Sequence, residues 1–286
     1  MTDSARGQLR KAGIRPDKGL GQHFLLDEAV LDLILEVSDV EDDDLIVEVG
    51  SGIGVLTRRL AERGARVLAV ELDRKLTRIL RERLGEQPNV QIIEADILEL
   101  DPVAAIAHEL GVQREDAPPF KVVGNLPYYI TSAILKHLLA PEIRPTRLTL
   151  MVQREVAERI TAQPGHLSLL AMSVQVYGTP RIVRRIPAGA FYPRPKVESA
   201  LLVIDVFGRA LVAAEVSEPF FHTLRAAFGQ KRKQLRNSLS QGLHLPKEQV
   251  LAALADASID PARRPQTLSV DDWLRLTRAL SVPAHG

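Results

Sequence analysis

Short β-branched runs alternate with helical patterns between residues 44 and 153, and this alternation restricts the chain to few folds. The runs that we interpret as strands are 44–50, 65–73, 90–98, 120–127 and 147–153. Between them, segments such as "GVLTRRLAERG", "RKLTRILRERLG" and "TSAILKHLLA" place apolar residues three and four apart, as amphipathic helices require. Near-continuous apolar strands joined by helices indicate a parallel α/β sheet covered on both faces. Ligands of such sheets bind beyond the carboxyl ends of the strands.

The remainder of the chain follows two other patterns. Residues 181–206 predict two further strands joined by a proline-rich loop, added antiparallel to the sheet. From Ser217 the periodicity is helical, with candidate helices at 217–240, 246–258 and 269–281, the last opened by Ser269 with Asp272 as a possible cap. A chain of 286 residues exceeds the usual size of one domain. We therefore expect a basic N-terminal arm over 1–26, an α/β domain over 27–207 and a smaller helical domain over 208–286.

The net charge of +1 is unevenly distributed along the chain. Residues 1–26 carry five Lys/Arg against two Asp/Glu, residues 208–286 carry eleven against seven, and residues 27–207 carry 21 against 27. This distribution suits a protein that binds a small ligand centrally and a polyanion peripherally, although ordinary surface variation produces the same pattern.

Composition excludes several classes of protein. The chain has no Cys, which removes disulfide frameworks, thiolate metal sites and cysteine nucleophiles, and we expect no metal. No apolar run approaches the ~20 residues that span a bilayer, and the first residues contain no apolar signal region. We expect a cytoplasmic monomer that does not associate with membranes.

Three successive strand ends carry residues suited to an adenosine ligand. In "EVGSGIGVLT", Glu48, Gly50, Gly52 and Gly54 form a turn whose backbone can approach a ligand closely. Its spacing, with an acid two residues before the first Gly, departs from the dinucleotide fingerprint G-x-G-x-x-G. Glu71 ends the second strand, where an acid can accept hydrogen bonds from ribose hydroxyls. Asp96 ends the third strand, where it can accept a hydrogen bond from an adenine amine. Each acid alone is typical of a solvated strand end, but together they indicate adenosine.

The fourth strand ends in "VVGNLPYYI", residues 122–130. By itself this stretch is typical of a strand-ending turn with a packed tyrosine. Next to an adenosine site it indicates chemistry, because Asn125, Leu126, Pro127 and Tyr128 would lie at the same edge of the sheet.

Taken together, these motifs resemble a known family. "EVGSGIGVLT", Glu71 and Asp96 resemble the S-adenosylmethionine (SAM) site of class I methyltransferases, which have a Rossmann-like fold, and "GNLPYYI" resembles the motif of those that methylate exocyclic amines. With "GLGQHFLLD", "FYPRPKVESA" and "AFGQKRKQLRNSL", the chain resembles the small-subunit ribosomal RNA adenine dimethyltransferase family from about Gly19 to the last helix. His23 departs from the family, which more often has Asn there.

The resemblance implies a function and a set of site residues. The implied reaction is SAM-dependent dimethylation of the N6 amine of two adjacent adenosines near the 3′ end of 16S rRNA, during ribosome biogenesis and with the small ribosomal subunit as partner. The residues implied to bind the cofactor are His23, Leu25, Gly50, Gly52, Glu71, Asp96 and Asn125. Those implied to act on the adenine are Asn125, Leu126, Pro127, Tyr128 and Phe191.

The chemistry of the amine explains the "NLPY" stretch. An adenine amine is a poor nucleophile, because its lone pair is delocalised into the ring. The side-chain oxygen of Asn125 and the carbonyl of Leu126 can each accept one N–H, which aims the lone pair at the methyl group. Pro127 restricts the backbone around that carbonyl, and Tyr128 offers a face on which a flipped base can stack. By resemblance, Phe191 would form a second aromatic wall.

The basic cluster near the C-terminus suggests RNA binding. Lys231, Arg232, Lys233 and Arg236 are predicted on one helix, where they form either a solvated face or a set of phosphate contacts. Two other functions stay open: a large-subunit rRNA adenine methyltransferase of the resistance type, and a ribosome-assembly factor that acts mainly by binding. The long C-terminal helical segment and "RKQLRNSL" favour the small-subunit enzyme over the large-subunit one.

Overall fold

The computed structural model describes residue 7 and residues 22–281. Most of the predicted arm over 1–26, including the start of "GLGQHFLLD", lies outside the described residues. The chain divides into two compact units: one contains the described residues up to 157 together with 180–206, and the other contains 158–179 together with the described residues from 207. Residues 158–179 therefore group with the helical unit, and not with the predicted 27–207 domain. Their backbone explains this, because Gly165 N donates to Gln266 O at 2.8 Å and Leu211 N donates to Val176 O at 2.9 Å.

The first unit is built on a seven-stranded sheet of order β4-β3-β2-β5-β6-β9-β7. The four pairs among β2 to β6 are parallel, and β9 runs antiparallel to β6, which confirms the predicted α/β sheet with an antiparallel addition. Because β2 is flanked by β3 and β5, the strand order reverses there, and a crevice is expected outside the carboxyl ends of these strands. The strands are β2 (Leu45–Val49), β3 (Arg66–Glu71), β4 (Val90–Glu94), β5 (Lys121–Asn125), β6 (Arg147–Gln153), β7 (Gly178–Ile186) and β9 (Ser199–Val206).

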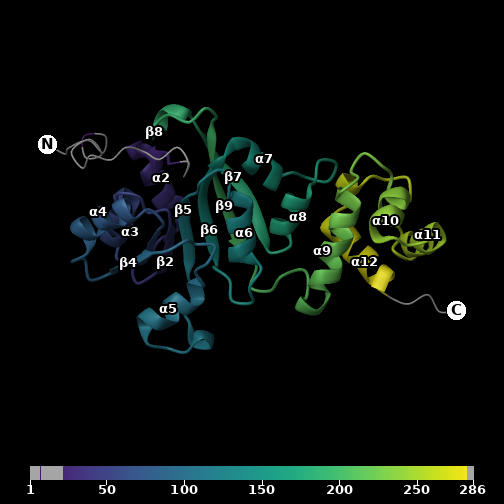
Figure 1. Cartoon of the computed structure of the whole chain (residues 1–286), viewed down its shortest axis with the longest axis horizontal. Helices are drawn as coiled ribbons and strands as arrows, with labels where there is room; N and C mark the ends of the chain where they lie inside the picture. Colours follow the sequence, from purple (N-terminus) through teal and green to yellow (C-terminus); the bar gives the residue numbers. More distant parts are fainter. Residues whose placement is uncertain (1–6, 8–21, 282–286) are drawn as a thin grey trace. The chain divides into compact units, whose positions relative to one another are not determined.

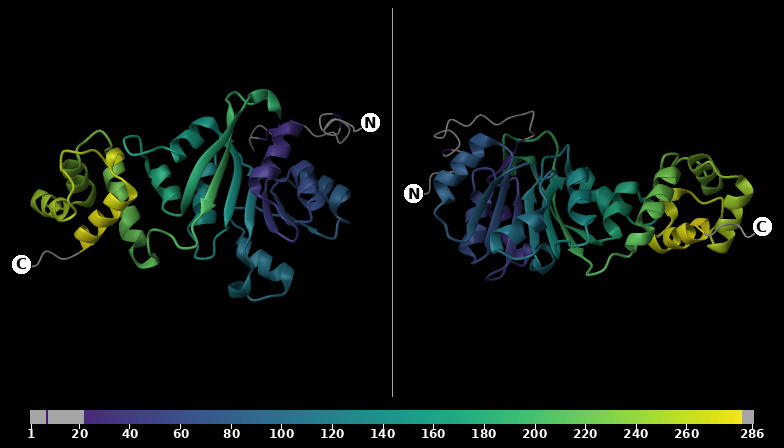
Figure 2. Two further views of the ribbon diagram at one scale, coloured as in Figure 1. Left: turned by 180° about the vertical axis from the view of Figure 1, so that it is seen from behind. Right: turned by 60° about the horizontal axis from the view of Figure 1, so that its bottom comes forward.

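Helices cover both faces of this sheet (Figures 1 and 2). Asp27, Asp73 and Asp101 cap three of them, each accepting a backbone N–H of the first turn with its side chain. We did not predict the helix that follows Asp27, although its buried residues recur three and four apart, as in Leu31, Ile34 and Leu35. The helices are α2 (Glu28–Ser38), α3 (Val55–Glu62), α4 (Arg74–Leu84), α5 (Pro102–Leu110), α6 (Thr131–Leu139) and α7 (Arg154–Ile160), with a 3-10 turn η1 at Arg114–Asp116.

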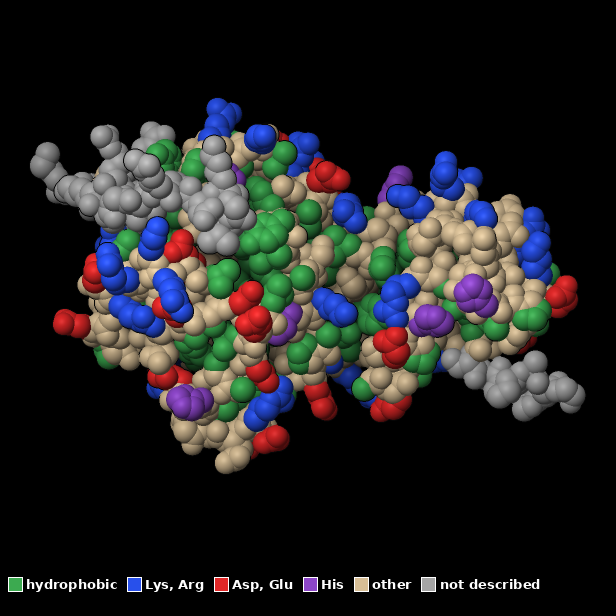
Figure 3. Space-filling model, viewed as in Figure 1, with side chains coloured by type: hydrophobic (Ala, Val, Ile, Leu, Met, Phe, Trp, Pro, Cys, Tyr) green, Lys and Arg blue, Asp and Glu red, His purple; other side chains and the backbone are tan. Residues whose placement is uncertain are grey.

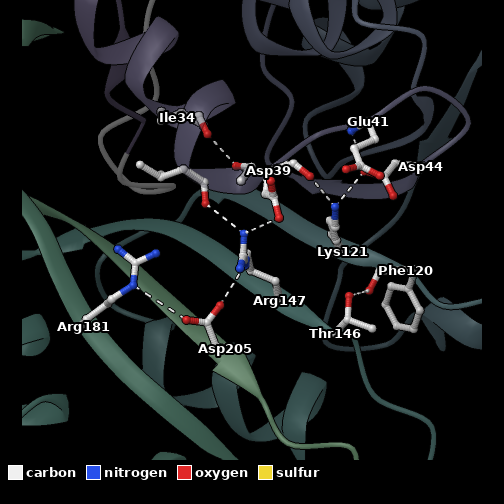
Figure 4. A network of polar contacts seen from close by, with 12 residues as sticks. Ile34, Asp39, Glu41, Asp44, Phe120, Lys121, Thr146, Arg147, Arg181 and Asp205 are labelled. Carbon is white, nitrogen blue, oxygen red and sulfur yellow. Dashed lines mark hydrogen bonds and ion pairs between the residues drawn. The ribbon is translucent and has the colours of Figure 1, made fainter.

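An ion-pair network joins α2 to the amino ends of the central strands (Figure 4). Arg147, the first residue of β6, pairs with Asp205 at 2.8 Å and with Asp39 at 3.2 Å. Lys121, the first residue of β5, pairs with Asp44 at 2.7 Å. These cations compensate acidic residues that follow α2, precede β2 and lie near the end of β9. This network lies at the amino ends of the strands, opposite the carboxyl ends at which a ligand is expected.

A short N-terminal segment, residues 22–26, reaches the carboxyl edge of the sheet, and we call it the strap. Its strand β1 (Phe24–Leu25) pairs antiparallel with β8 (Phe191–Tyr192), which follows the 3-10 turn η2 (Ala188–Ala190). At its other end, Gln22 Nε2 donates to Asp73 Oδ2 at 2.9 Å. The strap therefore runs between β8 and the start of α4, next to the ends of β2 and β3.

The second unit is helical, as predicted. Its buried core includes Phe220, Leu239, Leu254 and Trp273. The predicted cap of the last helix is confirmed, because Asp272 N donates to Ser269 Oγ at 3.1 Å and Ser269 N donates to Asp272 Oδ2 at 3.0 Å. Its helices are α8 (Leu169–Gln175), α9 (Ala214–Phe228), α10 (Leu235–Leu243), α11 (Lys247–Asp256) and α12 (Val270–Ser281), with a 3-10 turn η3 at Pro265–Thr267.

The prediction of one continuous helix over 217–240 is wrong. Helix α9 ends at Phe228 with Gly229 as its C-cap residue, and α10 begins at Leu235 after an extended Gln234. The connecting residues are polar, whereas Leu235 is fully buried, so the break lets α10 turn its apolar face into the core. Lys231, Arg232 and Lys233 therefore lie in the connection between two helices, and only Arg236 lies on a helix.

Candidate active site

A pocket lies at the carboxyl edge of the sheet, where the strand order reverses. Residues from the ends of four neighbouring strands and from the strap line it together. The predicted residues that line it are His23, Gly50, Gly52, Glu71, Asp96, Asn125, Leu126, Pro127 and Tyr128. Leu25 lines a smaller adjoining cavity, and Phe191 lines neither.

The glycine turn after β2 requires residues without side chains. Gly50, Gly52 and Gly54 all have positive φ, at 74°, 60° and 82°. A Cβ on Gly54 would lie 2.6 Å from a methyl carbon of Leu80, and a Cβ on Gly52 would lie 3.4 Å from the ring of Phe24. The turn is thus held between α4 and the strap, with its backbone exposed to the pocket.

Glu71 is held at the end of β3 by two backbone donors. Gly52 N donates to its Oε2 at 2.8 Å, and Asp73 N donates to its Oε1 at 2.9 Å. The side chain is 7% exposed, and burial raises the pKa of its carboxyl, although these hydrogen bonds oppose the increase. Because each carboxylate oxygen can accept more than one hydrogen bond, Glu71 keeps acceptor capacity for ribose hydroxyls.

Asp96 lies just beyond β4, which ends at Glu94, so the predicted strand over 90–98 was too long. Its Oδ1 accepts Leu98 N at 2.9 Å, and its Oδ2 has no partner among the described residues. The next residue, Ile97, is 5% exposed and lines the pocket as an apolar wall. We did not predict this wall from the sequence, although an apolar residue directly after the strand-end acid is the signal for it.

The residues of this pocket fit the adenosine part of SAM. Two carboxylates retain acceptor capacity, an apolar wall is available for a planar base, and a turn without Cβ atoms allows close approach. When bound, SAM supplies an electrophilic methyl group. Glu71 would bind its ribose, Asp96 would bind its adenine, and the glycine turn would let the rest of the cofactor approach the backbone closely.

Glu48 is a buried carboxyl beside the glycine turn, to which we assigned no role from the sequence. It is 2% exposed, lines the adjoining cavity and accepts a hydrogen bond from the Thr57 hydroxyl. Burial raises the pKa of Glu48 from 4.5 to about 7, despite that hydrogen bond. The Glu48 carboxyl therefore stays protonated in the folded chain over a pH range in which it is ionised in the unfolded chain.

Replacing Glu48 by Gln should remove a pH-dependent part of stability. Between pH 4.5 and about 7 the folded state binds the extra proton, so the free energy of unfolding falls as pH rises through this window. The contribution of protonated Glu48 to the free energy of unfolding is complete below pH 4.5 and lost above about pH 7. The difference in stability between wild type and Glu48→Gln should therefore change by about 3 kcal/mol across the window. Urea unfolding at several pH values measures it, with exposed Glu62→Gln as the control, and equal pH profiles for wild type and Glu48→Gln would contradict it.

Asn125 ends β5 with a defined side-chain orientation. Its Nδ2 donates to the backbone carbonyl of His23 at 2.6 Å, and its Oδ1 has no partner among the described residues. The following residue extends the strand, since Leu126 N donates to Met151 O at 3.1 Å, while the Leu126 carbonyl accepts no hydrogen bond within the described chain. Two unsatisfied acceptors thus lie on adjacent residues at the pocket.

Pro127 begins the turn that leads into α6. Its carbonyl accepts Ile130 N at 3.3 Å and the Thr131 hydroxyl at 3.2 Å. These bonds fix the turn on its helical side and leave the preceding Leu126 carbonyl uninvolved.

Tyr128 contacts two other segments. Its ring stacks on His23 with centroids 5.7 Å apart and planes inclined by 24°. Its hydroxyl is 2.6 Å from Ser199 Oγ at the start of β9, a partner that we did not predict from the sequence. Burial raises the pKa of the phenol, so it stays neutral at physiological pH.

Phe191 lies in the core. Its side chain is 4% exposed, packs in the same hydrophobic cluster as Leu25 and Leu201, and does not line the pocket. The register of the β1–β8 pair explains this, because it aligns Leu25 with Phe191 and Phe24 with Tyr192. The predicted second aromatic wall is therefore not assembled in this structure, and that role of Phe191 stays a prediction.

The basic residues of the second unit line a polar groove that we call the cationic groove. It is lined by Arg232, Lys233, Gln234, Asn237, Ser240, Gln241 and Lys247, and no acidic residue is among them. Lys233 Nζ donates to Gln241 at 2.8 Å, whereas the side chains of Arg232 and Lys247 have no partner among the described residues. Lys231 and Arg236 do not line the groove, and Lys247 was not predicted because it is distant in sequence.

Over residues 22–281, no helix combines the length and apolarity that crossing a bilayer needs. In the same range, no three or more His, Asp or Glu side chains are grouped so that they could hold a metal ion.

Comparison with known proteins places this geometry in a family. The model of the ribosomal RNA adenine dimethylase family matches residues 15–281. Proteins called ribosomal RNA small subunit methyltransferase A are similar: that of Dehalococcoides mccartyi is 44% identical, covering 95% of this chain and 91% of the relative, and that of Moorella thermoacetica is 41% identical, covering 95% of each.

Solved structures share the fold. The 23S rRNA methyltransferase ErmE is 29% identical with a TM-score of 0.69, covering 91% of this chain and 100% of that one. A dimethyladenosine transferase from Plasmodium falciparum has a TM-score of 0.75 at 22% identity, covering 89% and 96%. The predicted class I methyltransferase fold and SAM cofactor are thereby confirmed. The chain belongs to the ribosomal RNA adenine dimethylase family, enzymes that use SAM to dimethylate adenine in rRNA.

Proposed function

We propose that the chain dimethylates the N6 amine of two adjacent adenosines near the 3′ end of 16S rRNA in the small ribosomal subunit, during ribosome biogenesis. The observation that carries this choice is the similarity, over nearly the whole chain, to relatives named as small-subunit methyltransferases. We further propose that it acts as a monomer, because one chain carries both the pocket and the cationic groove, and that it acts in the cytoplasm, where its proposed ribosomal substrate would be.

The rival substrate is large-subunit RNA, favoured by the similarity to ErmE. The two are distinguished by incubating the protein and labelled SAM with isolated small subunits and with large-subunit RNA in parallel. We expect transfer to the small subunit, with two methyl groups on each of two neighbouring adenosines. Transfer to large-subunit RNA alone would refute the proposal.

The proposed mechanism uses the two free acceptors beside the pocket. Asn125 is oriented by the His23 carbonyl, which engages its Nδ2 and leaves Oδ1 for one N–H of the adenine amine. The Leu126 carbonyl would accept the second N–H. Together they favour a pyramidal nitrogen whose lone pair is directed away from the ring, so these residues position the nucleophile before the methyl group is transferred.

Capture of the base and loss of the proton complete the proposed mechanism. Tyr128 offers an aromatic surface for the flipped base, which is worth ~1–3 kcal/mol in comparable sites. After transfer the amine carries a positive charge and is strongly acidic, so it can lose its proton to water. No general base is needed for this step.

The cationic groove is proposed to bind phosphates of the RNA. Figure 3 shows Lys and Arg side chains along the edge of the second unit over α10 and α11. Many arginines of the first unit are paired with acids, as Arg74 is with Glu94, whereas Arg232 and Lys247 have no acidic partner within the described chain. Unpaired cations around a polar groove suit a polyanion better than a structural role. Lys231 and Arg236, outside the groove, would add less specific contacts.

Replacing Arg232 and Lys247 together by Ala should weaken binding to the small subunit and reduce the slope of log K against log salt by roughly one to two units. SAM affinity should not change, because the pocket lies in the other unit. Filter binding at several salt concentrations measures the slope. Arg225→Ala is the matched control, since Arg225 is already paired with Glu218. An unchanged slope in the double variant would leave the groove as an ordinary solvated surface.

A further inference from the structure

His23 contacts two residues of the proposed base site and one residue of the proline-rich loop. Its backbone carbonyl accepts Asn125 Nδ2 at 2.6 Å, and its ring stacks on Tyr128 with centroids 5.7 Å apart. Its Nδ1 is 2.7 Å from the carbonyl of Pro193. Because a carbonyl only accepts, Nδ1 carries the hydrogen and donates it.

The two stacked rings are anchored by one segment. The imidazole of His23 is bound to Pro193 in the proline-rich loop, and the phenol of Tyr128 is bound to Ser199, six residues further along the chain at the start of β9. Each ring thus has a polar anchor at its edge and an aromatic neighbour on its face. This closed set of contacts restricts the tilt of Tyr128 more than either contact would alone.

An adenine cannot enter between the two rings as they stand. A base inserted between two parallel rings needs them about 7 Å apart, twice the contact distance of ~3.5 Å between carbon atoms. The centroids are only 5.7 Å apart, so the spacing of the planes is no larger than that. The imidazole therefore occupies one face of the Tyr128 ring, and a base captured by Tyr128 would stack on the other face.

We propose that His23 is a positioning residue of the acceptor site, whose imidazole holds Tyr128 in the orientation that captures the target adenine. This assigns its side chain to the acceptor, whereas the family resemblance assigns His23 to the cofactor. Asparagine, the more common residue of the family at this position, has no ring to stack. The inference rests on the proposed base site at Asn125 and Tyr128.

The test uses four variants of the full chain in single-turnover methylation of small subunits at saturating enzyme and SAM. His23→Ala should lower the rate on the order of tenfold, because it removes one ring stack and one hydrogen bond. His23→Phe should recover most of the rate, because it keeps the stack. His23→Asn should recover little, because it keeps only a polar group. SAM affinity, measured by calorimetry, should stay within about twofold in all three.

The fourth variant, His137→Ala, controls for stability. His137 is also half-buried and also bonded to a backbone carbonyl, that of Leu100 at 2.7 Å, but it does not line the pocket. Its loss should lower the melting temperature about as much as His23→Ala and leave the rate unchanged. A purely structural role for His23 would predict equal rates for the two alanine variants.

Several results would overturn the proposal. The first is a rate of methyl transfer by His23→Ala that equals or exceeds the wild-type rate. The second is a His23→Phe variant that is as slow as His23→Ala. The third is a loss of SAM affinity that accounts for the loss of rate. Tyr128→Ala separates this failure from failure of the proposed function. If the base site is correct, the Tyr128→Ala variant transfers methyl groups slowly even when the His23→Ala variant has the wild-type rate. If the wild-type protein does not methylate small subunits, the proposed substrate is wrong.

Discussion

Replacing Asn125 by Ala is expected to lower the rate of methyl transfer about 10²- to 10³-fold while RNA binding changes little. The loss is large because the Asn125 oxygen is held ready for the amine by the bond between its Nδ2 and the His23 carbonyl. A preorganised acceptor acts mainly in the transition state, so its removal lowers the rate more than the affinity. Single-turnover methylation of small subunits measures the effect, and SAM affinity is determined in parallel because Asn125 lines the cofactor pocket.

Asn125→Asp is the sharper comparison. It keeps an acceptor oxygen for the amine, but it places a second carboxylate oxygen against the His23 carbonyl in place of a donor. We expect a rate between those of wild type and Asn125→Ala. Near-normal transfer by a folded Asn125→Ala variant would remove the proposed role of the acceptor pair.

Replacing Glu71 by Ala is expected to weaken SAM binding by about 1–3 kcal/mol, or roughly 5- to 150-fold in Kd. The variant loses the acceptor for the ribose hydroxyls, and it also leaves Gly52 N and Asp73 N without their partner. The second loss loosens the glycine turn itself, so the effect should exceed that of one missing ligand contact. Calorimetry with SAM measures it.

Glu94→Ala is the matched control for Glu71. The two residues are register partners at the ends of β4 and β3, but Glu94 does not line the pocket and instead pairs with Arg74 and Arg81. Glu94→Ala should therefore bind SAM normally. If the two alanine variants bind SAM equally well, Glu71 is not part of the cofactor site.

Local patterns predicted most of the first unit correctly. The strand predicted over 147–153 is observed at Arg147–Gln153, and the helix predicted from "RKLTRILRERLG" is observed at Arg74–Leu84. In the second unit, the Ser269–Asp272 cap was also predicted correctly. These features depend on residues at most a few positions apart, so hydrophobic periodicity and capping chemistry are sufficient to specify them. The convergence of Glu71, Asp96 and Asn125 on one pocket followed in turn, because carboxyl ends of parallel strands meet at one edge.

The errors occurred where distant contacts competed with local preference. The apolar periodicity over 217–240 is consistent with one helix, but burial of Leu235 in the core of the second unit is possible only if the chain breaks after Phe228. The burial of Phe191 likewise depends on a distant contact, its pairing with Leu25, and its proposed role as an aromatic wall stays a prediction. Neither outcome is visible in a short window of sequence.

The orientation of the reactive groups likewise depends on tertiary contacts. Asn125 and the His23 carbonyl are 102 residues apart in the chain, and Tyr128 and Ser199 are 71 apart. Residue types at strand ends are enough to predict what chemistry the site can perform. Which oxygen of the site is free, and which face of Tyr128 is supported, depends on which distant segment packs there, because the enthalpy of such contacts must offset the entropy of closing long loops.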